Sequence, residues 1–412
     1  MSFKTYYWGI FQKEFQEFLV FLVFLVLLRL YGGIGMLQGL KKESLVKDIE
    51  RNLKYPIMEV DLKKVYQNAK YMVDLCNSNG ISVAGVVKGF NGLPSVVDQF
   101  VNAGCDYIAH SRINGIIKLK EYGISSPMML VRIPMISEIE EVVKYAEVSL
   151  NSEFETLNAI ERECCKQNKN HKIILMFDLG DLREGFIDEE EFINLALYVE
   201  NELKHVELYG IGTNLGCYGS IKPSEDNLGK LCNLAEEIEK KIGRTLDIIS
   251  GGATSSLTLI IDGKMPKRIN NLRLGEGVIL AKDLDEFWNY DMSYMSQDTF
   301  TLKAEIVEIK NKPSHPIGEI FIDAFGNKEK YEDRGIRKRA LLAVGKQDFA
   351  FHHSLVPMDE GIEVIGSSSD HLIVDIESCD MNLKVGDVLG FYIYYPNMLF
   401  LSGSNDINKV YK

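Results

Sequence analysis

Beyond residue 55, short apolar runs alternate along the chain with longer stretches in which apolar positions recur at helical spacing. Eight such runs predict strands, and the amphipathic stretches between most of them predict helices. A series of eight βα units favours a closed (β/α)8 TIM-type barrel over residues 55–295, with a doubly wound open sheet as the alternative. The predicted barrel strands cover residues 81–87, 107–109, 128–133, 148–150, 172–177, 208–213, 246–250 and 271–274.

After about residue 295 the helical periodicity stops, and apolar runs separated by Gly, Asp, Asn and Pro turns follow one another. This pattern predicts a C-terminal all-β domain over residues 296–412, and a strand-like segment at 55–62 could pack on it. The expected strands of this domain cover residues 300–309, 319–324, 340–344, 363–365, 372–376 and 388–394.

Residues 1–54 form an N-terminal extension with a different pattern. Within it, residues 18–28 are an unbroken apolar run of eleven residues. That run is shorter than the about 20 residues that span a bilayer. It also lacks the basic start and small-residue cleavage site of a signal peptide. The extension is a partner-packed helix, a weak membrane-surface anchor or sequence upstream of the true start, and we favour the last.

Composition narrows the function classes. The net charge of -13 argues against binding of nucleic acid, because attraction to phosphates needs clustered Lys and Arg. The seven cysteines are dispersed and form no CxxC pair, which indicates reduced thiols in a cytoplasmic protein. The same dispersal argues against a disulfide framework or a bound metal. We therefore expect a small-molecule partner.

Catalytic residues of such a barrel lie just past the C-terminal end of each strand. Lys88 follows the apolar run ISVAGVV, so its stem is expected to be buried with its amine at the barrel mouth. A partly desolvated lysine has a lowered pKa and can form a Schiff base with a carbonyl. On its own, an ion-paired or snorkelling lysine would be the commoner case.

Two later strand ends have the composition of a phosphate site. The segment SGGATSS (residues 250–256) combines glycines with hydroxyls, and RLGEG (residues 273–277) offers a second cluster of amides. Phosphate binding by the loops after strands seven and eight recurs among these barrels. Together with Lys88, these loops predict pyridoxal 5′-phosphate (PLP) or a sugar phosphate as the ligand.

Four motifs occur in order along this part of the chain. They are MEVDLKKVYQNAKYM (residues 58–72), VVK (86–88), DLGDLREG (178–185) and RLG (273–275). These motifs resemble those of the alanine racemase superfamily, the fold-type III PLP enzymes. The first two resemble the opening strand and the PLP-lysine strand of that family. The last two resemble its D-x-G-x-x-R-x-G signature and its R-P-G motif. IGEIFIDAFGNK (317–328) and YEDRGIRKRA (331–340) resemble its ornithine racemase group. The resemblance covers roughly residues 55–394.

The resemblance implies a PLP-dependent racemase of a free amino acid, with a role for each matching residue. Lys88 would carry PLP and move a proton on one face of the substrate. Arg183 would lie near the phenolic oxygen in a polar group with Asn214, and Arg273 would lie at the pyridine nitrogen. Arginine is always charged and only donates, so it would keep that nitrogen unprotonated. The phosphate would be held by Thr254, Ser255 and the amides of Gly275 and Glu276.

The chain departs from the family pattern at three places. Gly92 and Met176 replace a tyrosine and a lysine that are common in alanine racemases. The family's second catalytic base is a tyrosine of the β domain, donated across a homodimer, and Lys346 stands in the corresponding segment VGKQD. A homodimer with a shared active site is still expected. The candidates for the second acid/base are Cys217, Lys346, Asp348, His371 and Tyr331.

Two acids of DLGDLREG bear on the substrate, because alanine racemases tend to carry apolar residues there. A carboxylate near the cofactor could pair with the distal ammonium of ornithine or lysine, a contact worth about 1.5 to 3 kcal/mol. We favour Asp181 for this role, because Glu184 can merely balance Arg183. The alternatives are an alanine racemase, a PLP decarboxylase or lyase on the same fold, and a PLP carrier. The second domain disfavours the carrier.

Overall fold

The computed structural model describes residues 53–328 and 330–412. Tyr55–Lys412 forms one compact unit. The apolar run at residues 18–28 lies outside the described residues. Within the described ranges, no helix is both long enough and apolar enough to cross a membrane.

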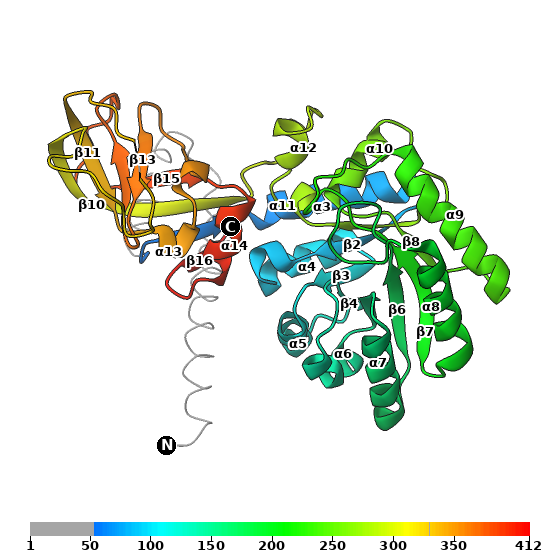
Figure 1. The fold of residues 1–412 in the computed structure, drawn as a ribbon. Coiled ribbons are helices and arrows are strands. Elements are labelled where there is room, and N and C mark those ends of the chain that lie inside the picture. The colour runs from blue at the N-terminus through cyan, green and yellow to red at the C-terminus, as the bar shows by residue number, and fades with distance from the viewer. Residues whose placement is uncertain (1–52, 329) are drawn as a thin grey trace, which may run out of the picture. The chain divides into compact units, whose positions relative to one another are not determined.

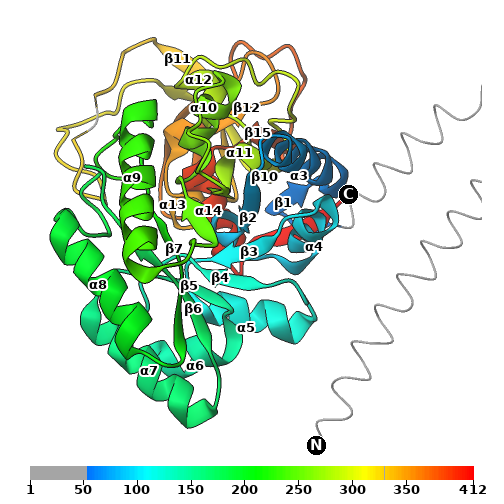
Figure 2. The ribbon, with the colours of Figure 1, turned by 90° about the vertical axis from the view of Figure 1, so that its right-hand side faces the viewer.

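Eight parallel strands close into a barrel, which confirms the predicted fold class. The barrel closes where Ser82 of the first of these strands pairs with Asn271 of the last. Figure 1 and Figure 2 show the helices on the outer side of the strands. The strands are β2 (Ser82–Val86), β3 (Tyr107–His110), β4 (Met128–Leu130), β5 (Val148–Asn151), β6 (His171–Met176), β7 (Val206–Gly212), β8 (Ile248–Ser250) and β9 (Asn271–Leu274). The helices are α3 (Leu62–Asn77), α4 (Pro94–Ala103), α5 (Ile113–Tyr122), α6 (Ile139–Tyr145), α7 (Phe154–Gln167), α8 (Glu189–Glu202), α9 (Glu225–Ile242), α10 (Leu257–Ile261), α11 (Glu276–Ile279) and α12 (Asp283–Glu286).

The inside of the barrel is filled by apolar side chains. Ala84, Met129, Leu150, Ile174 and Met176 form one buried cluster there. Larger clusters lie between the strands and the surrounding helices. Because the interior is packed, a ligand site has to lie at the mouth of the barrel and be built from the loops after the strands. Two of these loops form short 3-10 turns, η1 (Lys88–Phe90) and η3 (Thr254–Ser256).

The C-terminal part forms a separate sheet, in the order β12-β15-β10-β11-β14-β13. Strand β1 (Ile57–Val60), which precedes the barrel in sequence, joins this sheet: it pairs antiparallel with β10 and parallel with β16. The remaining elements are β10 (Phe300–Pro313), β11 (Ile336–Leu342), α13 (Lys346–Phe349), η4 (His352–Ser354), β12 (Val356–Pro357), β13 (Glu363–Ser367), β14 (Leu372–Asp375), β15 (Val388–Tyr392), α14 (Tyr395–Gly403) and β16 (Asn408–Tyr411).

Two expectations for this domain were wrong. The predicted strand at residues 319–324 is irregular, since no neighbouring strand in the described structure pairs with it. The helical pattern also does not end at residue 295, because α14 follows β15. This helix packs against η1: a Cβ atom at Gly89 would lie 2.9 Å from Cε2 of Tyr395. Glycine at this position therefore lets the second domain approach the lysine-bearing turn.

Asn397 fixes the start of α14. It is fully buried, and its side-chain amide donates to the carbonyl oxygens of Phe349 and Phe351, at 2.9 Å each. Its side-chain oxygen accepts a hydrogen bond of 3.1 Å from the backbone N–H of Tyr394. One side chain thus holds three backbone groups, of which the carbonyl oxygen of Phe349 is buried.

Replacing Asn397 by alanine should lower the free energy of unfolding by about 2 to 4 kcal/mol, because three backbone groups lose the partner that a fully buried side chain provides. Urea denaturation of the purified variant measures this change. The exposed Asn79→Ala is the matched control and should change stability by less than about 0.5 kcal/mol. Equal stability of the two variants would contradict the assigned role.

Candidate active site at the barrel mouth

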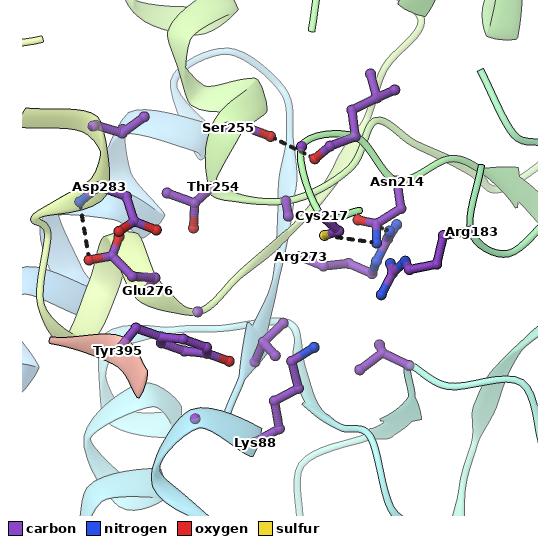
Figure 3. A pocket seen from close by; sticks show the side chains of 18 of the residues that line it. Lys88, Arg183, Asn214, Cys217, Thr254, Ser255, Arg273, Glu276, Asp283 and Tyr395 are labelled. Atoms are coloured by element: carbon purple, nitrogen blue, oxygen red, sulfur yellow. Dashed lines mark hydrogen bonds between the residues drawn. The ribbon is translucent and has the colours of Figure 1, made fainter. Parts of the chain in front are cut away.

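A cavity of about 490 Å³ lies at the C-terminal ends of the barrel strands. This volume is within the range typical of small-molecule sites. Figure 3 shows side chains from several loops converging on it. The predicted site residues that line it are Lys88, Arg183, Asn214, Cys217, Thr254, Ser255, Arg273, Gly275 and Glu276. Asp181, which was also expected at the site, does not line this cavity.

Lys88 follows strand β2 and begins η1. Burial is the main cause that lowers the pKa of its amine, and the charges of Arg183 and Arg273 act in the same direction. Cys217 and Glu184 oppose this shift. A lysine with a lowered pKa is more often neutral near pH 7, and a neutral amine can act as a nucleophile or accept a proton.

Arg273 lies at the end of β9, with 4% of its surface exposed. It donates to the Ser250 hydroxyl at 2.5 Å, to the Thr213 carbonyl at 2.7 Å and to the Asn214 side-chain oxygen at 3.4 Å. Burial lowers its pKa to about 10, which still leaves the guanidinium protonated at neutral pH. The cavity wall here therefore carries a permanent cation that donates but cannot accept.

Arg183 and Glu184 form an ion pair at the cavity. Arg183 Nε lies 2.6 Å from one carboxylate oxygen of Glu184, and Nη2 donates to the other at 2.7 Å. The side-chain amide of Asn214 lies 3.5 Å from Glu184 Oε1 and 3.3 Å from Cys217 Sγ. Together with the bond from Arg273 to Asn214, these contacts form one polar network along the ends of β6, β7 and β9.

The loops after β8 and β9 have the groups that a phosphate needs. The Thr254 hydroxyl accepts a hydrogen bond of 3.2 Å from the N–H of Gly277, and the Ser255 hydroxyl donates to the Leu215 carbonyl at 3.0 Å. A Cβ atom at Gly277 would lie 2.7 Å from Thr254 Cγ2, so the two loops touch because this residue is glycine. With a partly buried lysine and a donor-only arginine beside these hydroxyls and amides, the residues present fit PLP.

The sequence analysis missed three polar or aromatic side chains that line the cavity: Asp283, Trp288 and Tyr395. Tyr395 comes from α14 of the second domain. Burial is the main cause that raises the pKa of its phenol to about 12, so it remains protonated at neutral pH. The signal that could have found it is the proline after Tyr395, followed by the apolar residues Met398 and Leu401 at helical spacing.

The structure places Asp181 away from the cavity, contrary to the prediction. Its side chain has 1% exposed surface, and its carboxylate accepts backbone N–H bonds from Gly216, Cys217, Tyr218 and Ile221. Burial alone would raise its pKa, but these hydrogen bonds hold the pKa below the ordinary value. Asp181 thus shapes the loop that carries Cys217, and Glu184 is the acid of this motif that lines the cavity.

Of the candidates for the second acid/base, Cys217 lines the cavity of its own chain and four do not: Lys346, Asp348, His371 and Tyr331. Asp348 is buried and accepts a hydrogen bond of 3.0 Å from the N–H of Gly345. Lys346 Nζ lies 3.9 Å from the ring centroid of Phe325. Any role of these residues in catalysis would require a partner subunit.

A further set of side chains in the described structure has the spacing of metal ligands. His205 Nδ1 lies 2.8 Å from Glu161 Oε1 and 3.2 Å from Cys165 Sγ. The other carboxylate oxygen of Glu161 accepts the backbone N–H groups of His205 and Val206. These contacts join α7 to the start of β7, so they account for the cluster without an ion.

The barrel, the second domain and a lysine-bearing cavity at the barrel mouth define a class of enzymes, and comparisons identify the family. The model of the family "Alanine racemase, N-terminal domain" matches residues 60–282. An ornithine racemase of Acetoanaerobium sticklandii is 44% identical over 346 residues, which cover 84% of this chain and 96% of that protein. A lysine racemase of Thermotoga maritima is 37% identical over 358 residues, 87% of this chain and 99% of that protein.

Among solved structures, an alanine racemase of Clostridium difficile 630 superposes with a TM-score of 0.68 at 19% identity, covering 88% of this chain and 96% of that one. That likeness supports the fold. The chain therefore belongs to the alanine racemase family. It is an amino-acid racemase, and the family is one of PLP-dependent enzymes.

Replacing Asp181 by asparagine should lower kcat/KM about ten- to hundredfold for basic and neutral amino acids alike. Asparagine presents an NH₂ group to backbone N–H donors, so the loop that carries Cys217 loosens and the charge-assisted hydrogen bonds are lost. Racemisation of ornithine and alanine, followed by chiral chromatography, measures both values. A loss for ornithine alone would instead show that Asp181 reads the substrate charge.

Proposed function

We propose that this enzyme racemises a basic amino acid, ornithine first and lysine next, with PLP carried by Lys88. The observation behind the proposal is the cavity that brings together Lys88, Cys217 and Arg273. The ornithine and lysine racemases that resemble the chain over most of its length support this choice of substrate. They also favour racemisation over the decarboxylase or lyase alternative.

PLP, when bound, supplies the electron sink that makes the Cα proton of an amino acid acidic. Inverting the Cα centre requires one group that removes this proton from one face and another that returns a proton to the opposite face. We assign these roles to Lys88 Nζ and Cys217 Sγ, which reach the cavity from the ends of different strands (Figure 3). Each group takes up a proton in one direction of the reaction and releases one in the other.

The surroundings of these two groups support the assignment. Burial holds the pKa of Lys88 below its ordinary value, which suits a group that must accept a proton near neutral pH. The side-chain amide of Asn214 lies 3.3 Å from Cys217 Sγ and orients the thiol. The permanent charge of Arg273 would keep a ring nitrogen beside it unprotonated, which weakens the electron sink and limits reactions other than proton transfer.

We also propose that the functional unit is a homodimer. Ile317, Phe321 and Ile322, in the irregular segment between β10 and β11, have 90%, 76% and 56% of their surface exposed. Neighbouring exposed apolar side chains are typical of an interaction surface. A second copy of the chain would cover them, in agreement with the shared active site expected from the resemblance. A cytoplasmic location, expected from the dispersed cysteines, remains a prediction.

Replacing Lys88 by alanine should abolish covalent retention of PLP and reduce racemisation to background, because the buried amine that holds the cofactor is lost. The unmodified enzyme should absorb visible light, and reduction with borohydride should fix the cofactor to the peptide that contains Lys88. Absorption spectra and peptide mass spectrometry measure both effects. Fixation of the cofactor to Lys282, a buried lysine whose pKa is also lowered, would overturn the assignment.

Replacing Cys217 by alanine should lower kcat/KM for racemisation by about 10² to 10⁴, the usual contribution of a general acid or base. In D₂O this variant should still exchange the Cα hydrogen of one enantiomer without inverting it, because Lys88 continues to act on its own face. Chiral chromatography combined with mass measurement separates exchange from inversion.

The matched control is Cys165→Ala, since Cys165 is an exposed thiol on α7 that does not line the cavity. This variant should keep the unmodified rate. Exchange and inversion lost in parallel in Cys217→Ala, with PLP still bound, would rule out Cys217 as the second acid/base.

A further inference from the structure

Two carboxyl groups lie together at one end of the cavity. Glu276 begins α11 and Asp283 begins α12, and both side chains line the cavity. Figure 3 shows both at the side of the pocket opposite Arg183 and Asn214, with Thr254 between them and Cys217 in that view. The proton-transfer chemistry proposed above makes no use of either carboxylate.

Glu276 has a buried oxygen without a partner. One carboxylate oxygen accepts hydrogen bonds from the N–H groups of Lys282 at 2.9 Å and Asp283 at 3.3 Å. The other oxygen, Oε2, is buried and has no hydrogen-bond partner among residues 53–328 and 330–412. The residue as a whole has 8% exposed surface. An unsatisfied carboxylate oxygen at the wall of a cavity is costly unless a ligand supplies a donor.

The charges around this pair favour a cation. Burial, and next the charge of Asp283, raise the pKa of Glu276 above its ordinary value. Burial, and next the charge of Glu286, raise the pKa of Asp283. Both shifts mean that the site is unfavourable for two negative charges and would be stabilised by a positive group placed between them.

The ammonium group of Lys282 does not neutralise these two carboxyl groups. The buried Lys282 Nζ donates to the carbonyl oxygen of Ile393 at 3.1 Å and lies 4.2 Å from the ring centroid of Tyr394. Its charge lowers the pKa of Glu276, but the effect is smaller than those of burial and Asp283. Glu184 differs in this respect, because both of its carboxylate oxygens are engaged by Arg183.

The position of the pair suits the side chain of a substrate. In Figure 3, the Tyr395 ring and the two acids lie at one side of the pocket, and Lys88 and Cys217 lie at the other. The charges that shift the pKa of Lys88 most are those of Cys217, Arg183, Glu184 and Arg273, and not those of the two acids. A group that contacts the acids must therefore extend several bonds from the reacting Cα atom, as a distal ammonium does.

We propose that Glu276 and Asp283 form the subsite that binds the distal ammonium of a diamino acid, with the free Oε2 of Glu276 as the principal acceptor. The inference rests on the proposed function and adds the residues that select the substrate. An ammonium satisfies the orphan oxygen, whereas the methyl end of an apolar amino acid leaves it unpaired. Sites built around a buried polar group reject analogues that lack the matching group strongly.

The test compares ornithine with norvaline, which has the same carbon chain without the distal ammonium. Glu276→Gln keeps an oxygen that can accept the N–H groups of Lys282 and Asp283 but removes the charge. In the holoenzyme, kcat/KM for ornithine should fall at least tenfold, while that for norvaline should change less than threefold. Asp283→Asn should shift the ratio of the two values in the same direction. The dissociation constant of PLP, measured by fluorescence, should stay the same, because the substitution keeps the backbone amide of residue 276 that is expected to bind the phosphate.

Asp285→Asn is the matched control, because it removes a carboxylate from helix α12, which also carries Asp283, outside the cavity lining. It should leave the ratio unchanged. Parallel loss of both substrates, or weaker binding of PLP, in Glu276→Gln would overturn the inference and leave ornithine racemisation intact. An unmodified enzyme that racemises norvaline better than ornithine would instead overturn the proposed substrate. If either Glu276→Gln or Asp283→Asn fails to fold, the ratio of the two kcat/KM values in the other variant tests the inference.

Discussion

The buried guanidinium of Arg273 is the group on which the site depends. It joins the ends of three neighbouring strands, because it belongs to β9 and donates to Ser250 at the end of β8 and to Thr213 and Asn214 after β7. A buried charge costs several kcal/mol of desolvation unless its donors are satisfied. The barrel holds these acceptors in place, so the arginine stays protonated and the polar network that includes Asn214, Cys217 and Glu184 can form around it.

The second domain completes the cavity. Tyr395 reaches it from α14, and that helix approaches the lysine-bearing turn closely because Gly89 has no side chain. Asn397 holds the start of the helix through hydrogen bonds to three backbone groups. The pairing of β1 with β10 adds a second connection, because the strand that precedes the barrel belongs to the other sheet. The contacts that hold the domains together therefore also position the turn that carries Lys88.

Asp181, Glu184 and Glu276 all follow barrel strands and all carry a carboxylate, but their roles in the structure differ. The carboxylate of Asp181 accepts hydrogen bonds from four backbone N–H groups and so fixes the loop that carries Cys217. Glu184 is neutralised by Arg183. Glu276 keeps one oxygen unpaired at the cavity wall. The available hydrogen-bond donors, and not the charge itself, decide which of these acids can take part in binding.

The sequence by itself determined the barrel, the second domain and the strand ends that supply Lys88, Arg183, Asn214 and Arg273, because hydrophobic periodicity and strand-end position are local properties of the chain. It misassigned residues 319–324, since a strand also needs a neighbour to bond with. It favoured Asp181 over Glu184 and missed Tyr395. Those choices depend on contacts between segments far apart in the chain, and such contacts exist once the tertiary structure has formed.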